Sequence, residues 1–207
     1  MKHSGIVLLS SLLYLLVVGN VIAAPVNLAL SGTASQSSTY NEAYPCSWCG
    51  PELAIDNNTY GIWVPGDGNG NTITHTNSEY EAWWQVDLGN TYNIEQIDIW
   101  NRTDIGVEDR LHDFTLSILD SGLNPVWSQL YDEIAGVHEI FGSMGTGILA
   151  AGQYVKVQFS GHAEYLSLAE VQVWGEPTPV PIPAAVWLFG SGLLGLIGFS
   201  RRKKAAA

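Results

Sequence analysis

Hydrophobic and polar residues alternate with a period of two along most of the chain. The alternation is clearest in four segments, residues 97–99, 114–118, 155–159 and 171–173. Successive side chains of a β-strand point to opposite faces, so each segment predicts a half-buried strand. No amphipathic helix of useful length is indicated between residues 26 and 175. The pattern predicts an all-β fold, an antiparallel β-sandwich or jelly roll.

Turn-forming residues separate these segments and indicate the same fold class. The chain contains 22 Gly and 9 Pro, and clusters such as Asp120-Ser121-Gly122 stand between the alternating runs. Such residues are typical of tight turns between strands. A longer Gly/Asn-rich segment, Pro65–Asn77, predicts a surface loop, and loops of this length usually bind something.

Both ends of the chain depart from this pattern. Residues 1–23 combine a charged start, an apolar run and small residues before Ala24. This layout predicts a cleavable secretory signal peptide, with an uncleaved membrane anchor as the alternative. After a Pro-rich linker at residues 176–183, the apolar stretch Ala184–Phe199 precedes the basic cluster Arg201–Lys204. A helix over this stretch reaches about 24 Å, so it would cross a bilayer core of about 30 Å only with local thinning.

The C-terminal segment, residues 184–207 with Val180-Pro181-Ile182-Pro183 before it, resembles the bacterial PEP-CTERM sorting signal. The Val-Pro-x-Pro form stands where a Pro-Glu-Pro triplet would be. The resemblance implies that an exosortase removes the membrane anchor; a simple tail anchor is the alternative. Because basic residues stay on the cytoplasmic side, the body is expected outside. We expect a protein exported across the inner membrane, transiently anchored by its C-terminal helix, and then secreted or held at the cell surface.

Charge narrows the set of partners. The formal net charge is −12, but five of the eight basic residues lie in the terminal segments. The other three, Arg102, Arg110 and Lys156, stand against twenty acidic residues, which gives the body a charge of −17. Repulsion from phosphate argues against nucleic-acid binding, and the acidic background favours divalent cations.

Cys46 and Cys49 are the only cysteines of the chain. In an exported protein this spacing favours a small local disulfide. A thiol–disulfide redox motif expects a strand-to-helix context that the sequence lacks, and a complete zinc site needs two more ligands. Redox chemistry and free or metal-binding thiols are the alternatives.

Several segments carry a resemblance to a known family. They are Asn27–Leu30, Ala34–Ser38, Ala54–Asn58, Trp83–Gly89 and Leu168–Val173. Through these segments, residues 26–175 resemble a discoidin or coagulation-factor (F5/8) type C domain of the galactose-binding-like superfamily. Within that superfamily the chain is most similar to the fucolectins, or F-type lectins. The resemblance implies one β-sandwich domain that binds a sugar without catalysis.

The fucolectin sugar motif is a His, then Arg-x-Asp, then a second basic residue. It matches His75, Arg102, Asp104 and Arg110, and the body contains no other arginine. Two guanidinium groups offer rigid donors to vicinal hydroxyls, an imidazole adds a further hydrogen bond, and the Asp can hold the first Arg in position.

Two features depart from the family motif. Adjacent cysteines that pack on the sugar are replaced here by Ile105-Gly106, and the spacing to Arg110 is one residue longer. Ile105 or Trp63 could supply the flat apolar surface that a pyranose ring prefers. Packing within its own loop is the alternative role for Trp63.

The same resemblance implies a calcium ion that braces the sugar-binding loops. The implied ligands are oxygen atoms, as calcium prefers. They are the carbonyls of Leu53, Asn58 and Ala169, the side chains of Asp56 and Glu170, and Thr72. In the alternative, Asp56 and Asn58 only build an Asx turn, and Glu170 is a solvated strand residue.

The sequence thus predicts an exported, non-catalytic carbohydrate-binding protein. Its expected ligand is fucose or a related sugar at the cell surface or in an exopolysaccharide matrix. One alternative is a structural extracellular-matrix or protein-interaction module that binds no sugar. The other is a glycan hydrolase, although no Gly-x-Ser-x-Gly, His-Glu-x-x-His or phosphate-loop motif is present.

Overall fold

The computed structural model describes residues 24–41, 46, 48–63, 72–145 and 147–177. The predicted signal peptide and C-terminal sorting segment lie outside the described residues. Within the described ranges, no helix is long and apolar enough to cross a membrane.

The described chain consists of strands and three short 3₁₀ turns. The strands are β1 (Val26–Asn27), β2 (Thr33–Gln36), β3 (Ser78–Tyr80), β4 (Trp83–Asn101), β5 (His112–Leu119), β6 (Pro125–Ile134), β7 (His138–Gly142), β8 (Ala150–Phe159), β9 (Ala163–Tyr165) and β10 (Leu168–Pro177). The 3₁₀ turns are η1 (Leu28–Ser31), η2 (Pro51–Ile55) and η3 (Glu108–Arg110). The four alternating segments of the sequence lie in β4, β5, β8 and β10, so those strand predictions are confirmed.

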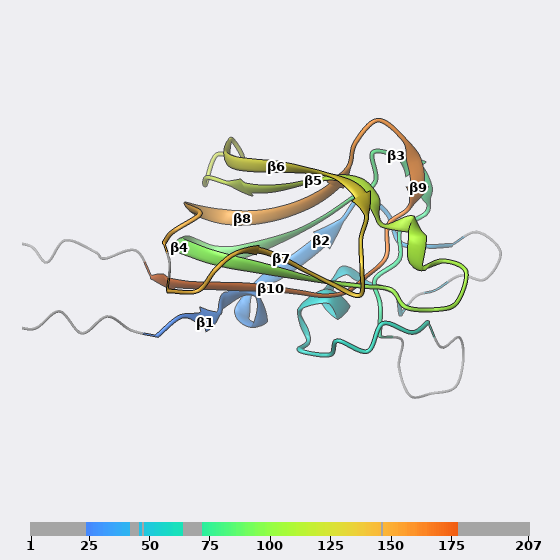
Figure 1. The fold of residues 1–207 in the computed structure, drawn as a ribbon, viewed down its shortest axis with the longest axis horizontal. Helices are drawn as coiled ribbons and strands as arrows, with labels where there is room; N and C mark the ends of the chain where they lie inside the picture. The colour runs from blue at the N-terminus through green and yellow to red at the C-terminus, as the bar shows by residue number, and fades with distance from the viewer. Residues whose placement is uncertain (1–23, 42–45, 47, 64–71, 146, 178–207) are drawn as a thin grey trace, which may run out of the picture.

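The strands form an antiparallel β-sandwich, which confirms the predicted fold class. The main path of the sheet is β1-β10-β4-β8-β5-β6. Strand β4 is shared between the layers, because it pairs with β2 and β8 from its start, with β8 as far as Ile94, and with β10 and then β7 toward its end. The pairing with β10 begins at Tyr92, directly after the register with β8 shifts between Asp87 and Tyr92, in the stretch that contains Gly89 at φ +81°. Figure 1 shows β5, β6 and β8 in one layer and β7 and β10 in the other.

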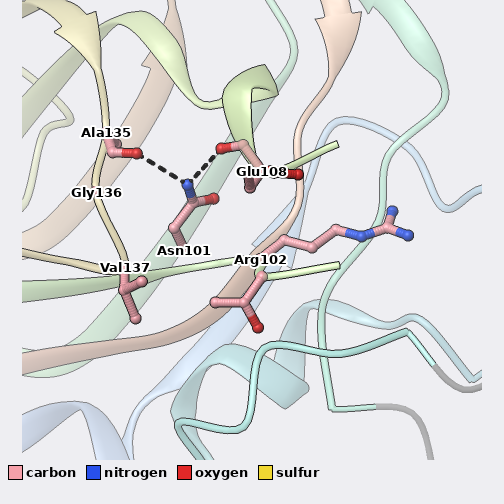
Figure 2. Close-up of a pocket in the computed structure, with 7 residues that line it drawn as sticks. Asn101, Arg102, Glu108, Ala135, Gly136 and Val137 are labelled. Atoms are coloured by element: carbon pink, nitrogen blue, oxygen red, sulfur yellow. Dashed lines mark hydrogen bonds between the residues drawn. The ribbon is translucent and has the colours of Figure 1, made fainter. Parts of the chain in front are cut away.

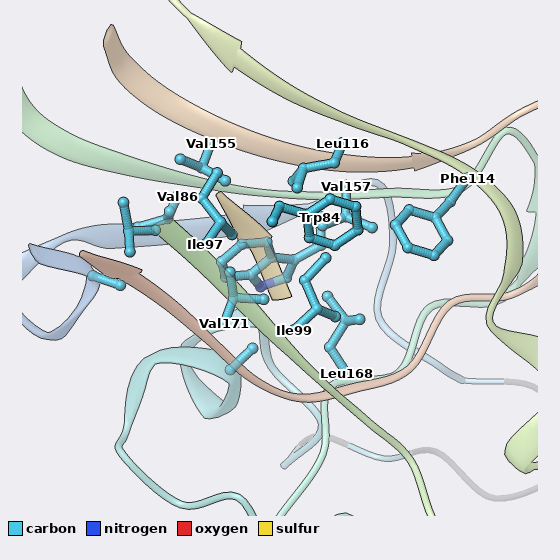
Figure 3. Close-up of a cluster of buried hydrophobic side chains, with 14 of the residues drawn as sticks. Trp84, Val86, Ile97, Ile99, Phe114, Leu116, Val155, Val157, Leu168 and Val171 are labelled. Carbon is cyan, nitrogen blue, oxygen red and sulfur yellow. The ribbon is translucent and has the colours of Figure 1, made fainter. Parts of the chain in front are cut away.

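A single hydrophobic core fills the space between the layers. Its fully buried side chains include Trp84, Ile97, Phe114, Leu116, Val157 and Val171, which come from both layers (Figure 3). The polar atom of the buried Trp84 ring also has a hydrogen-bond partner, because its Nε1 donates to the Pro51 carbonyl at 2.9 Å. This bond fastens η2 to the core, as buried indoles usually require a partner.

The segment after the long loop is buried, which corrects the prediction that all of Pro65–Asn77 is a surface loop. Residues 72–76 are all at most 9% exposed. The N–H of Thr74 donates to the Leu168 carbonyl at 2.8 Å, and the Thr74 hydroxyl accepts from the Leu168 N–H at 3.0 Å. Thr76 makes the same pair of bonds with Leu166. The two threonine hydroxyls thus accept the hydrogen bonds that backbone carbonyls would accept in a regular strand pair. The alternation of hydrophobic and polar residues along the sequence cannot reveal such a pairing.

Several loops lie together at one end of the sandwich. Figure 1 places β3, β9 and η3 at the end opposite the start of β1 and the end of β10. The residues of the predicted sugar motif come from this end, at the close of β4, in η3 and beside β9.

Candidate functional site

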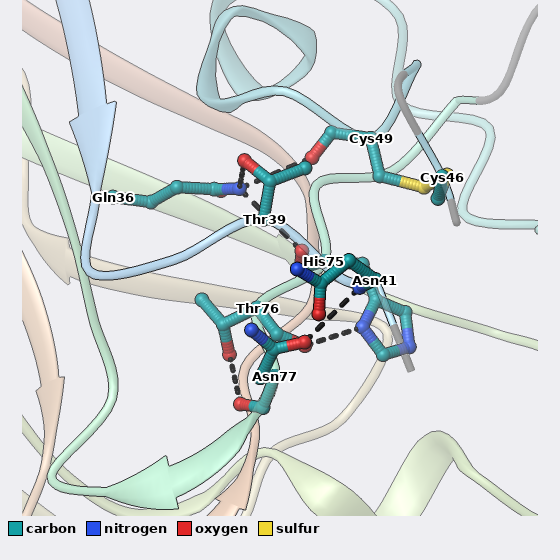
Figure 4. Close-up of a disulfide and its surroundings, with 8 residues drawn as sticks. All are labelled: Gln36, Thr39, Asn41, Cys46, Cys49, His75, Thr76 and Asn77. Carbon is teal, nitrogen blue, oxygen red and sulfur yellow. Dashed lines mark hydrogen bonds between the residues drawn. A yellow bond between two sulfur atoms is a disulfide. The ribbon is translucent and has the colours of Figure 1, made fainter. Parts of the chain in front are cut away.

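His75 is held by its own backbone and by the disulfide loop beside it. Its side chain is only 2% exposed, and its Nδ1 lies 2.7 Å from the Thr76 carbonyl. The His75 N–H donates to the Cys49 carbonyl at 3.2 Å, and the His75 carbonyl accepts from the Tyr40 N–H at 2.9 Å. Figure 4 shows His75 beside this loop. The imidazole position is therefore fixed before any ligand arrives.

Cys46 and Cys49 form a disulfide, and both are buried. Cys46 donates its N–H to the Tyr40 carbonyl at 3.0 Å. The Nε2 of Gln36 contacts both the Cys49 carbonyl, at 3.2 Å, and the His75 carbonyl, at 3.4 Å (Figure 4). The disulfide thus organises the loop against which His75 rests.

Arg102 and Asp104 follow directly from the end of β4. The Nε of Arg102 donates to Oδ2 of Asp104 at 2.5 Å, and the same carboxylate accepts from the Trp63 N–H at 3.0 and 3.2 Å. The Arg102 guanidinium also lies over the Trp63 ring, 5.2 Å from its centroid. Burial lowers the pKa of Arg102, the charge of Asp104 acts against that change, and the nearby charge of Arg110 adds to it. Asp104 therefore orients Arg102 and ties the Trp63 loop to the end of β4.

The segment between the two arginines is anchored by Asn101. Its Nδ2 donates to the carbonyls of Glu108, at 2.8 Å, and Ala135, at 3.2 Å (Figure 2). A cavity of about 210 Å³ lies on this side of the chain, lined by residues 101–103, 108 and 135–137. The Arg102 guanidinium points away from this cavity (Figure 2). The cavity is therefore separate from the surface that carries the sugar motif.

Arg110 is the more exposed of the two arginines. Its guanidinium lies over the Tyr165 ring, 4.9 Å from the centroid, and its Nε is 3.8 Å from Oε1 of Glu164. The side chain is 30% exposed. The η3 turn and β9 thus place a guanidinium beside an aromatic ring at the surface.

A cluster of rings joins the two arginines through His75. The His75 ring lies 4.7 Å from Tyr40, 5.7 Å from Trp63 and 5.3 Å from Tyr165, measured between centroids. Because Arg102 covers Trp63 and Arg110 covers Tyr165, the structure brings His75, Arg102, Asp104, Arg110 and Trp63 together. Ile105, by contrast, is 99% exposed. Of the two apolar substitutes named from the sequence, only Trp63 belongs to this cluster.

Sequence reasoning missed Tyr40 and Tyr165. Tyr40 lies in the loop after β2, and Tyr165 lies in β9, a strand of three residues. Neither sits in a motif, and the two rings approach to 5.8 Å across a separation of more than a hundred residues. Only the paired loops at this end of the sandwich bring them together, so no local signal could have found them.

Five of the six residues of the predicted calcium site, all but Thr72, lie in η2, just after it, or in β10. Glu170 is fully buried, and its carboxylate accepts from the N–H groups of Asp56, at 3.2 Å, and Asn57, at 3.1 Å. Burial, and then the charge of Asp56, raise the pKa of Glu170 to about 7. Burial also raises the pKa of Asp56.

The alternative reading of these residues is right in one part and wrong in another. Asp56 does form an Asx turn, with its Oδ1 accepting from the Asn58 N–H at 2.9 Å. Glu170, however, is buried and not solvated. The Thr72 hydroxyl donates to the Ile62 carbonyl at 2.8 Å, and it also bonds the Tyr60 carbonyl. The carbonyl ligands named from the sequence belong to the same elements, with Leu53 in η2, Asn58 just after it and Ala169 in β10.

This donor set fits a hard divalent cation. The Glu170 carboxylate is buried and the charge of Asp56 raises its pKa further, and calcium binds clusters of carboxylate and carbonyl oxygens. A bound cation would offset the cost of burying Glu170 in its charged form.

Comparison with known proteins defines the class of this domain. A family model described as a NedA-like, galactose-binding domain of the F5/8 type C group matches residues 66–157. Fucolectin-6 of Anguilla japonica is 32% identical over 149 residues, which cover 71% of this chain and 74% of that protein. On this evidence the chain belongs to the fucolectin family, and its function is that of a carbohydrate-binding, lectin-like protein.

Two further comparisons agree with this assignment. A pentraxin fusion protein of Xenopus laevis is 27% identical over 165 residues, which cover 74% of this chain; the chain spans 35% of that longer protein. The solved structure of a Streptococcus pneumoniae fucose-binding module is 31% identical, with a TM-score of 0.59, over 72% of this chain and 96% of the module.

Proposed function

We propose that the protein binds a neutral sugar of the fucose type at the surface formed by His75, Arg102, Arg110 and the rings around them. The observation that carries this proposal is the run of contacts from Arg102 through Trp63, His75 and Tyr165 to Arg110. It places two guanidinium groups on either side of an imidazole, next to aromatic surfaces that suit a pyranose ring. The fucose-binding module among the similar structures supports the same class of sugar.

The charges at this surface favour a neutral ligand. Arg102 is paired with Asp104, and Arg110 lies near Glu164. These four groups carry no net charge, and the body around them is acidic. An anionic sugar would therefore gain little from the arginines, whereas hydroxyl groups gain directional hydrogen bonds. Binding at this surface involves no bond chemistry.

Calcium is the cofactor that we propose for the junction of η2 and β10. Asp56 and Glu170 would supply carboxylate oxygens, with the carbonyls of Leu53, Asn58 and Ala169 and with Thr72 completing the set. The ion would supply positive charge that fixes η2 against β10. The buried Glu170 with a pKa of about 7 supports this assignment, because an anion there needs a compensating cation.

We further propose that the protein is exported and processed by an exosortase-type enzyme before display at the cell surface or release. The disulfide between Cys46 and Cys49 supports an oxidising compartment. Intact-mass measurement of the mature protein tests this proposal. The expected product begins at Ala24 and lacks the C-terminal basic cluster; a full-length chain in the mature protein would contradict it.

A glycan array probed with the full chain tests the sugar proposal. Retention on fucosylated glycans, lost in Arg110→Ala, is the expected result. The matrix-module alternative predicts that no glycan is retained and that cell-surface retention survives the same substitution. The hydrolase alternative predicts sugar release from native polysaccharide on long incubation, which our proposal excludes.

A further inference from the structure

Three side chains with metal-binding chemistry meet outside both sites described above. His112 and Asp113 open β5, and His162 lies in the turn between β8 and β9. One ligand atom from each of the three falls within 4.8 Å of the others. The His112 and Asp113 side chains are 34% and 50% exposed, so an ion could enter from solvent.

Both histidines are oriented in the way that metal ligands usually are. Nδ1 of His112 lies 2.8 Å from Oδ2 of Asp113, and Nδ1 of His162 lies 3.3 Å from the Ser160 carbonyl. Because a carboxylate and a carbonyl only accept hydrogen bonds, each Nδ1 is the protonated nitrogen and each Nε2 carries the lone pair. A carboxylate or carbonyl behind the distal nitrogen is the usual support of a ligating histidine. The Nε2 of His162 is buried without a hydrogen-bond partner among the described residues.

The backbone holds the two histidines face to face. Their rings stack with centroids 4.6 Å apart and planes within 13°. The Ser160 N–H donates to the Asp113 carbonyl at 2.8 Å, and the hydroxyls of Thr115 and Ser160 lie 2.8 Å apart. Asp113 adopts a left-handed φ of +44°, a conformation that costs energy for a residue other than glycine. Hydrogen bonds between β5 and the β8–β9 turn thus keep the two histidines side by side, while the lone pair of each imidazole stays in its own ring plane.

We propose that His112, His162 and Asp113 form a binding site for a divalent transition-metal ion, with Zn²⁺ as its representative. The two imidazole nitrogens would ligate the ion, Asp113 would orient His112, and water would fill the open positions. Imidazole suits zinc and copper, whereas calcium prefers oxygen ligands. Zinc–nitrogen bonds of about 2.0–2.1 Å put two ligating nitrogens at most about 4.2 Å apart. One imidazole would therefore rotate out of the stack to share an ion with the other.

The ion would brace two segments that carry sugar-site residues. Arg110 precedes His112 by two positions, and Tyr165 follows His162 by three. The proposal itself concerns metal binding and does not depend on which sugar is bound.

Zinc titration of the full chain tests the site, with excess Ca²⁺ present so that the carboxylates of the calcium site are occupied. Calorimetry of the wild type and of His112→Ala, His162→Ala and His138→Ala gives the comparison. His138 is the matched control, because it also stacks on a ring and approaches a carboxylate, Asp98, but lies outside the cluster. We expect one zinc site in the wild type and in His138→Ala, and an affinity at least tenfold lower in the other two.

Chemical modification of the wild-type histidines tests the same site without any variant that could fail to fold. Zinc should protect His112 and His162 from acylation by diethyl pyrocarbonate, read by peptide mass spectrometry, and should leave His138 unprotected. Asp113→Asn should lower the affinity for zinc by about tenfold, because loss of a supporting carboxylate lowers metal affinity by about 10–100-fold. No zinc binding by the wild type, wild-type zinc affinity in both His112→Ala and His162→Ala, or protection of His138 alone would each overturn the site.

Discussion

At the scale of single residues, Arg102 and Arg110 share a motif but differ in what their loss would do. Arg102 is buried against Trp63 and paired with Asp104, so removing it leaves a carboxylate with one partner fewer and disturbs the loop. Arg110 is partly exposed and 3.8 Å from its carboxylate, a pairing worth little to stability. Arg110 therefore reports on ligand binding with the least effect on folding.

Arg110→Ala should lower affinity for a fucosylated glycan by about 10- to 100-fold, the usual cost of losing hydrogen bonds from a charged donor. Its melting temperature should stay within about 2 °C of the wild type. Lys156→Ala is the matched control, because Lys156 also lies over an aromatic ring, Trp83, but comes from the middle of β8. Calorimetry checks both; equal losses in the two variants would contradict the role of Arg110.

At the scale of elements, the disulfide loop supports His75 through backbone hydrogen bonds. Crosslinking a ring of four residues removes chain entropy worth about 2 kcal/mol. The Cys46→Ala/Cys49→Ala double variant should therefore melt about 4–8 °C lower, given the usual temperature shift per kcal/mol for a domain of this size. Because the Cys49 carbonyl accepts from His75, glycan affinity should fall as well. Differential scanning calorimetry with glycan titration tests both, and an unchanged affinity would show that His75 does not need this loop.

The junction of η2 and β10 predicts a dependence of stability on pH. The pKa of Glu170 is raised from its ordinary 4.5 to about 7, so the protonated form favours folding. Without calcium, the stability from this group is fully present below about pH 4.5 and is lost as the pH rises toward 7. Melting curves in chelator should show this decline, and Glu170→Gln should flatten it. Glu52→Gln, at an exposed position of η2, should keep the wild-type profile.

Calcium should reverse that decline. A ligand at a hundred times its dissociation constant stabilises the folded state by about 2.7 kcal/mol, which corresponds to about 5–10 °C for a domain of this size. The effect should be larger at pH 7.5 than at pH 5, because calcium competes with protons for the carboxylates. Melting curves with and without chelator at both pH values measure it. Coincident curves at pH 7.5 would contradict the site.

At the scale of the whole molecule, the sequence predicted the strands that show a regular alternation and missed the contacts between segments that are far apart in the chain. Alternation located β5, β8 and β10, because a half-buried strand imposes its period on every residue. It could not show that β4 serves both layers, since that depends on which strands pair with each half. It also could not foresee the burial of Thr74 and Thr76, where hydroxyls replace carbonyls. The motif named His75 and both arginines, but the rings of Tyr40 and Tyr165 reach them only in the folded chain.

Calorimetric titration of L-fucose into the full chain with calcium tests the claim that this surface binds a fucose-type sugar. We predict saturable binding to the wild type, weaker binding in chelator, and none detectable for Arg110→Ala at the same concentrations. An absence of heat for the wild type in both buffers would contradict the claim. It would mean that Ile105-Gly106, in place of the family's cysteine pair, leaves the rings around His75 unable to hold this sugar.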